Sequence, residues 1–177
     1  NLFLSISSTT RKKRPNEISG KDYNFVTVEA FKEQLKKNNF IEHAKVFDNF
    51  YGTDKLLVES KINEGKDLLF DIDWQGAQQL REKMREDIVS VFILPPSKSE
   101  LEQRLKNRGQ DDDEVVKKRM DGASSEITHW AEYDYVIINK NLEESVNTVL
   151  GILKAERMKR IRQIGLGEFI RSINLDN

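Results

Sequence analysis

The sequence predicts an α/β fold in which helices flank a mainly parallel sheet. Short, apolar, strand-like segments alternate along the chain with helical patterns of about ten or more residues, as they do in βαβ units. The chain has 177 residues, of which 37% are hydrophobic and 33% charged. This length and composition are typical of one globular domain with a sizeable core.

The predicted strands are short apolar runs bounded by turn residues. The clearest is the buried run at residues 68–70, and another, at residues 89–94, is ended by Pro95 and Pro96. Residues 22–53 are richer in short strands, which predicts a small β-rich insert. The predicted strands are residues 2–6, 23–26, 40–47, 66–73, 89–94 and 135–138.

Helices are predicted where apolar side chains recur every three or four residues between capping residues. Thr27 is placed as the N-cap of one helix, and Gly65 ends another. Ser97, followed by Glu100, has the spacing of a capping box at the start of a third helix. The predicted helices are residues 28–37, 54–63, 74–84, 97–107, 113–131 and 142–163.

The charge balance and the absence of cysteine exclude several classes of function. The chain has 29 Lys and Arg residues against 30 Asp and Glu residues, a net charge of -1, which argues against bulk nucleic-acid binding. No apolar run approaches the length of about 18 residues that a membrane span needs, so no membrane association is expected. Zero cysteines exclude disulfides, thiolate zinc sites and cysteine nucleophiles. A cytoplasmic location is expected.

Residues 7–15 form a polar loop that is rich in basic and hydroxyl side chains. Arg11 and Arg14 provide guanidinium groups, and residues 7–10 are all Ser or Thr. Guanidinium and hydroxyl donors together suit a phosphate dianion. A solvated surface loop explains the same composition equally well.

Two acids, Asp71 and Asp73, follow the buried run at residues 68–70. In a strand, both carboxylates would share one face at the carboxyl end, where open α/β sheets bind their ligands. A carboxylate at that position commonly orients Mg²⁺ through water. Alternatively, Asp73 is the N-cap of the helix that starts at Trp74.

Three arginines surround a glycine break. Arg104 and Arg108 are four residues apart and therefore share a helix face, and Arg119 follows Gly109 and an acidic run. Three guanidinium groups on a hinged segment suit a closing lid that neutralises a phosphoryl group. Spacing alone favours ordinary surface ion pairs, such as Glu100 with Arg104.

Glu42, Tyr51 and Thr53 form a further candidate group. A buried glutamate can accept hydrogen bonds from the N–H and amino groups on one edge of guanine, and a threonine hydroxyl can donate to its O6 atom. From the sequence alone, the default interpretation of Glu42 is a glutamate on the surface. The histidines His43 and His129 lack the spacing of metal ligands.

Five motifs, in order along the chain, resemble those of guanylate kinases. They are residues 5–14 (SISSTTRKKR), 20–23 (GKDY), 50–53 (FYGT), 71–76 (DIDWQG), and 95–97 (PPS) with the three arginines that follow. The resemblance implies a P-loop nucleoside monophosphate kinase core with a small β-rich GMP-binding subdomain and a helical lid. It also implies transfer of the γ-phosphoryl group of ATP to GMP, giving GDP and ADP, with Mg²⁺.

The resemblance assigns roles to individual residues. The GMP phosphate would be held by Ser7, Arg11, Arg14, Tyr23 and Tyr51, and the guanine by Glu42, Thr53 and Asp73. The lid arginines around the γ-phosphate would be Arg104, Arg108 and Arg119, with Asp71 near the metal ion and the transferring phosphate. Asn139 falls where the family has an asparagine on the ATP side, although Lys140 and Asn141 replace the acidic pair that follows it in the family.

The resemblance implies one domain over residues 1–177, with a GMP-binding region at about residues 8–60 and a lid at about residues 104–125. None of the nine glycines lies in the G-x-x-x-x-G-K-[ST] frame of a phosphate-binding loop, and the chain begins with Asn1 inside a predicted strand. We expect that the first strand, the P-loop and the first helix precede Asn1. A relative that lacks the loop altogether is the alternative.

Two other functions fit parts of the pattern. A non-catalytic guanylate-kinase-like module would bind a phosphorylated protein partner, but it would leave the lid arginines and Asp71 without a role. A kinase for another nucleoside monophosphate is disfavoured by Glu42 and Thr53. The sequence does not fix the oligomeric state, and a homodimer is compatible with it.

Overall fold

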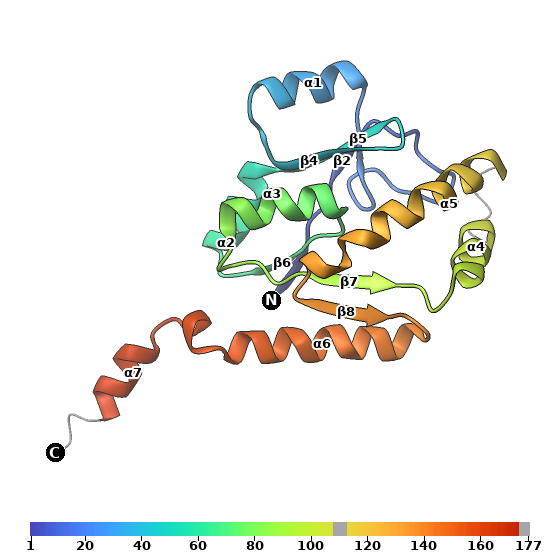
Figure 1. Ribbon diagram of the computed structural model, residues 1–177. Helices are drawn as coiled ribbons and strands as arrows, with labels where there is room; N and C mark the ends of the chain where they lie inside the picture. The colour runs from blue at the N-terminus through green and yellow to red at the C-terminus, as the bar shows by residue number, and fades with distance from the viewer. Residues whose placement is uncertain (108–112, 174–177) are drawn as a thin grey trace. The chain divides into compact units, whose positions relative to one another are not determined.

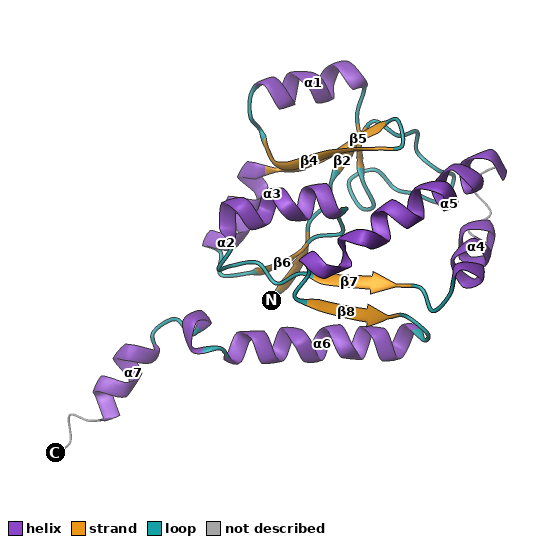
Figure 2. Ribbon diagram, viewed as in Figure 1, coloured by secondary structure: helices purple, strands orange, loops and turns teal. Residues whose placement is uncertain are grey.

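The structure is a computed structural model that describes residues 1–107 and 113–173. Figure 1 labels helices and strands along the ribbon. The chain divides into two compact units. Unit 1 comprises Asn1–Ile88 and Gln110–Glu126, and unit 2 comprises Val89–Gly109 and Ile127–Asn177. The mixed α/β architecture confirms the predicted fold class (Figure 2).

Unit 1 begins with a parallel strand pair, β1 (Leu2–Leu4) and β6 (Asp67–Leu69), in which Phe3 pairs with Leu68. The buried core beside it is formed by Ile41, Val58 and Leu80, against which Leu68 packs. These side chains come from a strand and two helices that are far apart in the sequence.

The β-rich part of unit 1 is a four-stranded sheet with the order β3-β2-β5-β4. Its strands are β2 (Ser8–Thr9), β3 (Asn24–Phe25), β4 (Phe40–Val46) and β5 (Asn49–Asp54). Strands β4 and β5 are antiparallel, and their register places Glu42 opposite Thr53. Strands β3, β4 and β5 lie in the segment of residues 22–53 for which the sequence predicts a β-rich insert, and the sheet also includes β2, which lies before that segment.

The hairpin between β4 and β5 turns on two residues, Phe47 and Asp48, with φ angles of 47° and 64°. Positive φ at both positions matches the right-handed twist of the flanking strands, and Asn-Gly is the usual sequence for such a loop. A phenylalanine there gives no turn signal. The sequence pattern therefore predicts a strand that continues to residue 47, and it gives no separate signal for β5.

Three helices of unit 1 begin at side-chain caps. Helix α1 (Val28–Lys36) is capped by Thr27, as predicted, and its Phe31 stacks on Phe40 with ring centroids 4.5 Å apart. Asp54 caps α2 (Lys55–Asn63) and Asp73 caps α3 (Trp74–Met84). Gly65, with φ of 69°, follows α2 as predicted. The last helix of this part of the chain is α5 (Asp113–Thr128).

Unit 2 contains a second parallel pair, β7 (Val91–Leu94) and β8 (Tyr135–Ile138). Its α-helices are α4 (Lys98–Asn107), α6 (Leu142–Met158) and α7 (Leu166–Ile173). Two 3-10 helices, η1 (His129–Glu132) and η2 (Arg160–Arg162), follow α5 and α6. The helices predicted at residues 113–131 and 142–163 therefore end earlier than expected, each in a 3-10 turn.

Two further local predictions need correction. The strand predicted at residues 66–73 ends at Leu69, so Asp71 and Asp73 lie beyond the strand and share no strand face. Ser97 caps α4 through the Glu100 N–H at 3.1 Å, but the Glu100 carboxylate binds Arg104 and does not complete the capping box. No helix of the described residues is long and apolar enough to cross a membrane.

Candidate active site

The centre of the candidate site is a buried chain of three polar side chains in unit 1. The Thr53 hydroxyl donates to Glu42 Oε1 at 2.5 Å, and Ser7 Oγ lies 3.3 Å from Thr53 Oγ1. Because the Thr53 hydroxyl uses its hydrogen in the bond to Glu42, the Ser7 hydroxyl must be the donor in its hydrogen bond with Thr53. Only 2% of Glu42 and none of Thr53 is exposed. The β4–β5 register produces this chain, because Glu42 and Thr53 are cross-strand partners.

The N-terminus of α3 approaches the Glu42 carboxylate closely. A Cβ atom on Gly76 would lie 2.5 Å from Glu42 Oε2, so only glycine leaves room for the acid in its present position. Asp73 Oδ1 accepts the Gly76 N–H at 3.1 Å, which confirms the N-cap interpretation of Asp73. Gly76 is thus a further residue of the site, beyond those that the sequence motifs indicate.

Burial raises the pKa of Glu42 above its ordinary value. The hydrogen bond from Thr53 opposes this shift, and the negative charge of Asp73 adds to it. A carboxylate in such surroundings has few water molecules to satisfy it. It is therefore prepared to accept donors from a ligand.

The basic loop is folded around one acid, Glu17. The Arg11 guanidinium donates to both carboxylate oxygens of Glu17, at 2.6 and 3.0 Å, and the Arg14 N–H donates at 2.7 Å. The Arg11 guanidinium also lies 5.3 Å from the ring centroid of Tyr23, which meets Tyr51 edge to face at 6.0 Å. The structure thus brings four of the predicted phosphate-binding residues together, although sequence reasoning gave no role to Glu17.

Tyr23 is partly buried, and burial raises the pKa of its hydroxyl; the next largest cause is the negative charge of Asp71. A tyrosine hydroxyl is protonated near neutral pH already at its ordinary pKa of 10.0, and the raised pKa extends this donor state to higher pH. Asp71 itself is exposed, two residues after the end of β6.

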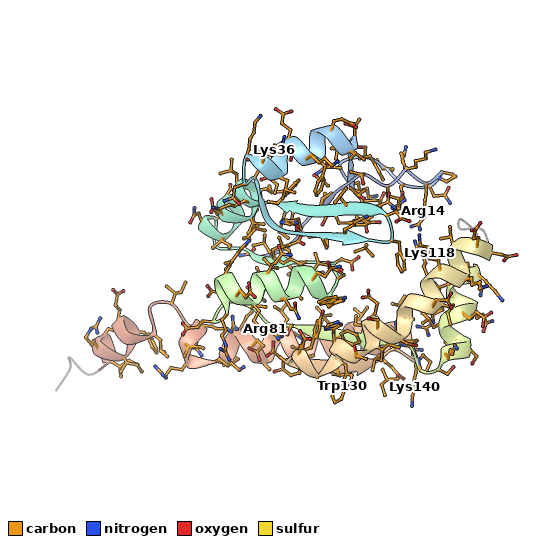
Figure 3. The ribbon with its side chains drawn as sticks, turned by 45° about the horizontal axis from the view of Figure 1, so that its top comes forward. Arg14, Lys36, Arg81, Lys118, Trp130 and Lys140 are labelled. Carbon is orange, nitrogen blue, oxygen red and sulfur yellow. The ribbon has the colours of Figure 1, made fainter. Side chains whose placement is uncertain are left out.

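The described arginines of the predicted lid belong to different units. In unit 1, the Arg119 guanidinium on α5 lies 5.9 Å from the ring centroid of Phe47. The neighbouring Lys118, which is labelled in Figure 3, forms an ion pair with Asp48 of the β4–β5 hairpin. In unit 2, Arg104 donates to the backbone carbonyl of Asn139 at 2.9 Å. Arg108 lies outside the described residues.

Asn139 directly follows β8 in unit 2. Its side-chain oxygen accepts a hydrogen bond from the Ser145 hydroxyl at 3.1 Å, and its N–H donates to the carbonyl of Leu94 at 2.8 Å. Together with the bond from Arg104, these contacts fix the residue at the end of the β7–β8 pair. Among residues 1–107 and 113–173, no group of three or more His, Asp or Glu side chains could hold a metal ion by itself.

Comparisons with known proteins identify the family of the chain. The family model for guanylate kinase matches residues 2–156. The chain belongs to the guanylate kinase family. A guanylate kinase from Paramagnetospirillum magneticum is 55% identical over 97% of this chain and 80% of its own length. One from Zymomonas mobilis is 54% identical over the same shares of the two chains.

A solved structure supports the same assignment. The crystal structure of guanylate kinase from Anaplasma phagocytophilum is similar with a TM-score of 0.83 and 44% sequence identity. The match covers 97% of this chain and 84% of that chain. Guanylate kinases are nucleoside monophosphate kinases, and the identity over most of the chain extends the fold and the function of that family to it.

Proposed function

We propose that the buried chain of Ser7, Thr53 and Glu42 recognises the guanine of GMP, in a guanylate kinase that transfers the terminal phosphoryl group of ATP to GMP. Guanine presents an N–H and an amino group side by side, and a carboxylate accepts from both. Adenine lacks this pair of donors. The Thr53 hydroxyl can turn from Glu42 to the guanine O6 atom, and Asp73 lies beside Glu42 as a further acceptor for the base.

The basic loop is the proposed site for the GMP phosphate. Arg11 and Arg14 provide charge-assisted donors, and Tyr23 and Tyr51 provide hydroxyl groups beside them. Ser7 stands at the junction of the two subsites, because its hydroxyl binds Thr53 of the base pocket.

The proposed transfer machinery comprises Asp71 and the arginines 104, 108 and 119, with Asn139 on the ATP side. These residues would position the two polyanionic nucleotides and neutralise the charge of the phosphoryl group during its transfer. The reaction needs no protein nucleophile. Closure of the arginines over the nucleotides would also exclude water, which would otherwise hydrolyse ATP.

The residues fit a magnesium ion that is held mainly by ATP. Mg²⁺ usually binds one or two carboxylates, water and substrate phosphates, so it needs no cluster of protein ligands. The exposed carboxylate of Asp71 suits a contact through water. When bound, the ion would supply positive charge to the β- and γ-phosphates. The proposal includes a cytoplasmic location, where both nucleotides are available.

The single observation that carries the base assignment is the full burial of the Thr53–Glu42 hydrogen bond. The test is Glu42→Gln, which replaces one acceptor of the pair by a donor. We expect KM for GMP to rise about 100-fold, the effect of one or two lost hydrogen bonds to a charged group, with KM for ATP unchanged.

The matched control is Glu86→Gln, at an exposed position after α3. It makes the same chemical change outside the pocket and should leave both KM values as they are. An unchanged preference for GMP over AMP in the Glu42→Gln variant would overturn the assignment.

A further inference from the structure

Strand β4 lies at one edge of its sheet, and α3 covers that edge with hydrogen bonds from its side chains. The strand order β3-β2-β5-β4 gives β4 only one neighbouring strand, so the outward backbone groups of alternate residues need other partners. Three side chains of α3 supply partners for the carbonyls of three residues and for one N–H group. Gln75 donates to the carbonyl of Lys45 at 3.3 Å, Gln79 pairs with His43, and Lys83 donates to the carbonyl of Ile41.

The spacing of this ladder follows from the geometry of the two elements. Side chains four residues apart on a helix repeat every ~6 Å along its axis. Outward backbone groups on a strand repeat every two residues, which is ~6.7 Å. The two repeats are close enough for three successive contacts, with the helix running antiparallel to the strand.

Gln79 makes the most complete contact of the three. Its side-chain oxygen accepts the His43 N–H at 3.1 Å, and its side-chain nitrogen donates to the His43 carbonyl at 2.6 Å. The amide thus pairs with both backbone groups of one residue, as a neighbouring strand would. His43 directly follows Glu42, so this contact fixes the backbone beside the acid.

The ladder also reaches the second acid of the base pocket. Gln75 Nε2 donates to Asp73 Oδ2 at 2.8 Å as well as to the β4 carbonyl. The same face of α3 therefore sets the position of Glu42 through the strand and of Asp73 through its own first turn. Gly76, between them, leaves the space in which the Glu42 carboxylate lies.

From this arrangement we infer that Gln79 is a positioning residue for guanine recognition: it holds β4 against α3 and so sets the place of the Glu42 carboxylate. The inference rests on the proposed role of Glu42. Gln79 itself needs no contact with the nucleotide. Its influence is on the choice of base, because a displaced Glu42 can no longer accept from both guanine donors.

The test compares GMP with inosine monophosphate, which has the same ring N–H but no amino group. In Gln79→Met, which keeps the length of the side chain and removes its hydrogen bonds, the ratio of kcat/KM for GMP to that for inosine monophosphate should fall about tenfold or more, because the acceptor is misplaced. KM for ATP should not change. Glu82→Met, at an exposed position of the same helix, is the control and should keep the wild-type ratio.

A second variant and a direct measurement at His43 distinguish a positioning role of Gln79 from general destabilisation of the fold. Gln79→Glu keeps an acceptor for the His43 N–H and loses the donor, so an intermediate ratio is expected. Hydrogen exchange at the His43 amide should be faster in Gln79→Met than in the wild type. A lower Tm with an unchanged nucleotide ratio in both variants would show a purely structural role and overturn the inference.

A double-mutant cycle separates this inference from the proposed function. In a Glu42→Gln background, Gln79→Met should lower the nucleotide ratio no further, because the two residues act on the same interaction. If Glu42→Gln alone leaves the ratio at the wild-type value, the assignment of Glu42 fails. If Glu42→Gln lowers the ratio and Gln79→Met does not, only the role of Gln79 fails.

Discussion

The carboxylate of Glu17 holds the guanidinium of Arg11 through two hydrogen bonds, with oxygen–nitrogen distances of 2.6 and 3.0 Å. The same carboxylate accepts the N–H of Arg14. One acid therefore organises the loop that carries the two arginines proposed to bind the phosphate. Arginine has five donors in a fixed fork, so Arg11 can keep Glu17 and still offer N–H groups to a phosphate.

Removal of this acid should weaken GMP binding, although it removes a negative charge from a site for an anion. In Glu17→Ala, loss of the orientation of Arg11 should raise Kd for GMP about tenfold, as measured by titration calorimetry. Glu33→Ala, which breaks an exposed ion pair with Lys37, should leave Kd unchanged. Tighter binding in Glu17→Ala would show that charge repulsion by Glu17 outweighs its positioning of Arg11.

The ionisation of Glu17 and that of Glu42 should change the stability of the fold in opposite directions as the pH rises. The hydrogen bond from Arg11 lowers the pKa of Glu17, so the stabilisation by Glu17 is present above the ordinary carboxyl pKa and is lost as pH falls through the lowered value. Burial raises the pKa of Glu42, so the folded state binds that proton more tightly than the unfolded chain does. Ionisation of Glu42 therefore costs stability as pH rises through the window between 4.5 and its raised pKa.

Glu42→Gln should separate stability from function. The neutral amide avoids the burial of a charge and can still accept from Thr53, so Tm at pH 7 should equal or exceed that of the wild type while GMP affinity falls. In the wild type, GMP binding should weaken as pH drops through the raised pKa of Glu42, because the protonated acid loses one acceptor site. Calorimetric scans from pH 4.5 to 8 would check both effects. A lower Tm at pH 7 for the variant would contradict this account.

Gly76→Ala should impair GMP binding with little loss of stability. The new Cβ would lie 2.5 Å from Glu42 Oε2, and the end of the glutamate side chain is the part that can move. A shift of that carboxylate should raise Kd for GMP about ten- to 100-fold. Alanine also favours the helix, which offsets part of the cost.

Gly151→Ala is the matched control, because no atom lies within 4 Å of a Cβ at that position in α6. There the substitution should stabilise the protein by about 0.5–1 kcal/mol with GMP affinity unchanged. Equal GMP affinity in the two variants would show that the Glu42 carboxylate tolerates displacement.

Arg119→Ala should act on the chemical step. If Arg119 neutralises the phosphoryl group in transfer, kcat should fall about 100-fold or more with a modest change in KM for GMP. The neighbouring Lys118→Ala breaks only an exposed ion pair with Asp48 and should change kcat little. A loss confined to GMP affinity in Arg119→Ala would exclude the proposed role.

The sequence predicted those elements whose signals are local. The helix expected at residues 74–84 and the strand expected at residues 135–138 have the bounds of α3 and β8. Strand β5 carries no such signal, because the turn before it contains Phe47, a residue that seldom adopts positive φ. The short strand β2 lies in a segment whose sequence predicts a loop, since two residues carry no periodicity.

The residues of the candidate site likewise divide into those with a local sequence signal and those without one. Glu42 and Thr53 could be selected from motifs, but their direct hydrogen bond depends on the β4–β5 register. Gly76 could have been found from the close approach that a glycine permits near a helix start. Gln79 could not, because its contacts with His43 join residues 36 positions apart and leave no trace in the composition of either segment.

The ladder of α3 side chains on β4 also bears on how the chain behaves at high concentration. An unpaired strand edge invites addition of a strand from another molecule, which is a common first step of aggregation. Here the carbonyls of Ile41, His43 and Lys45 and the His43 N–H are occupied, and the opposite edge of the sheet, β3, is only two residues long. The helix that shapes the base pocket thus also leaves this sheet with little edge on which a foreign strand could grow.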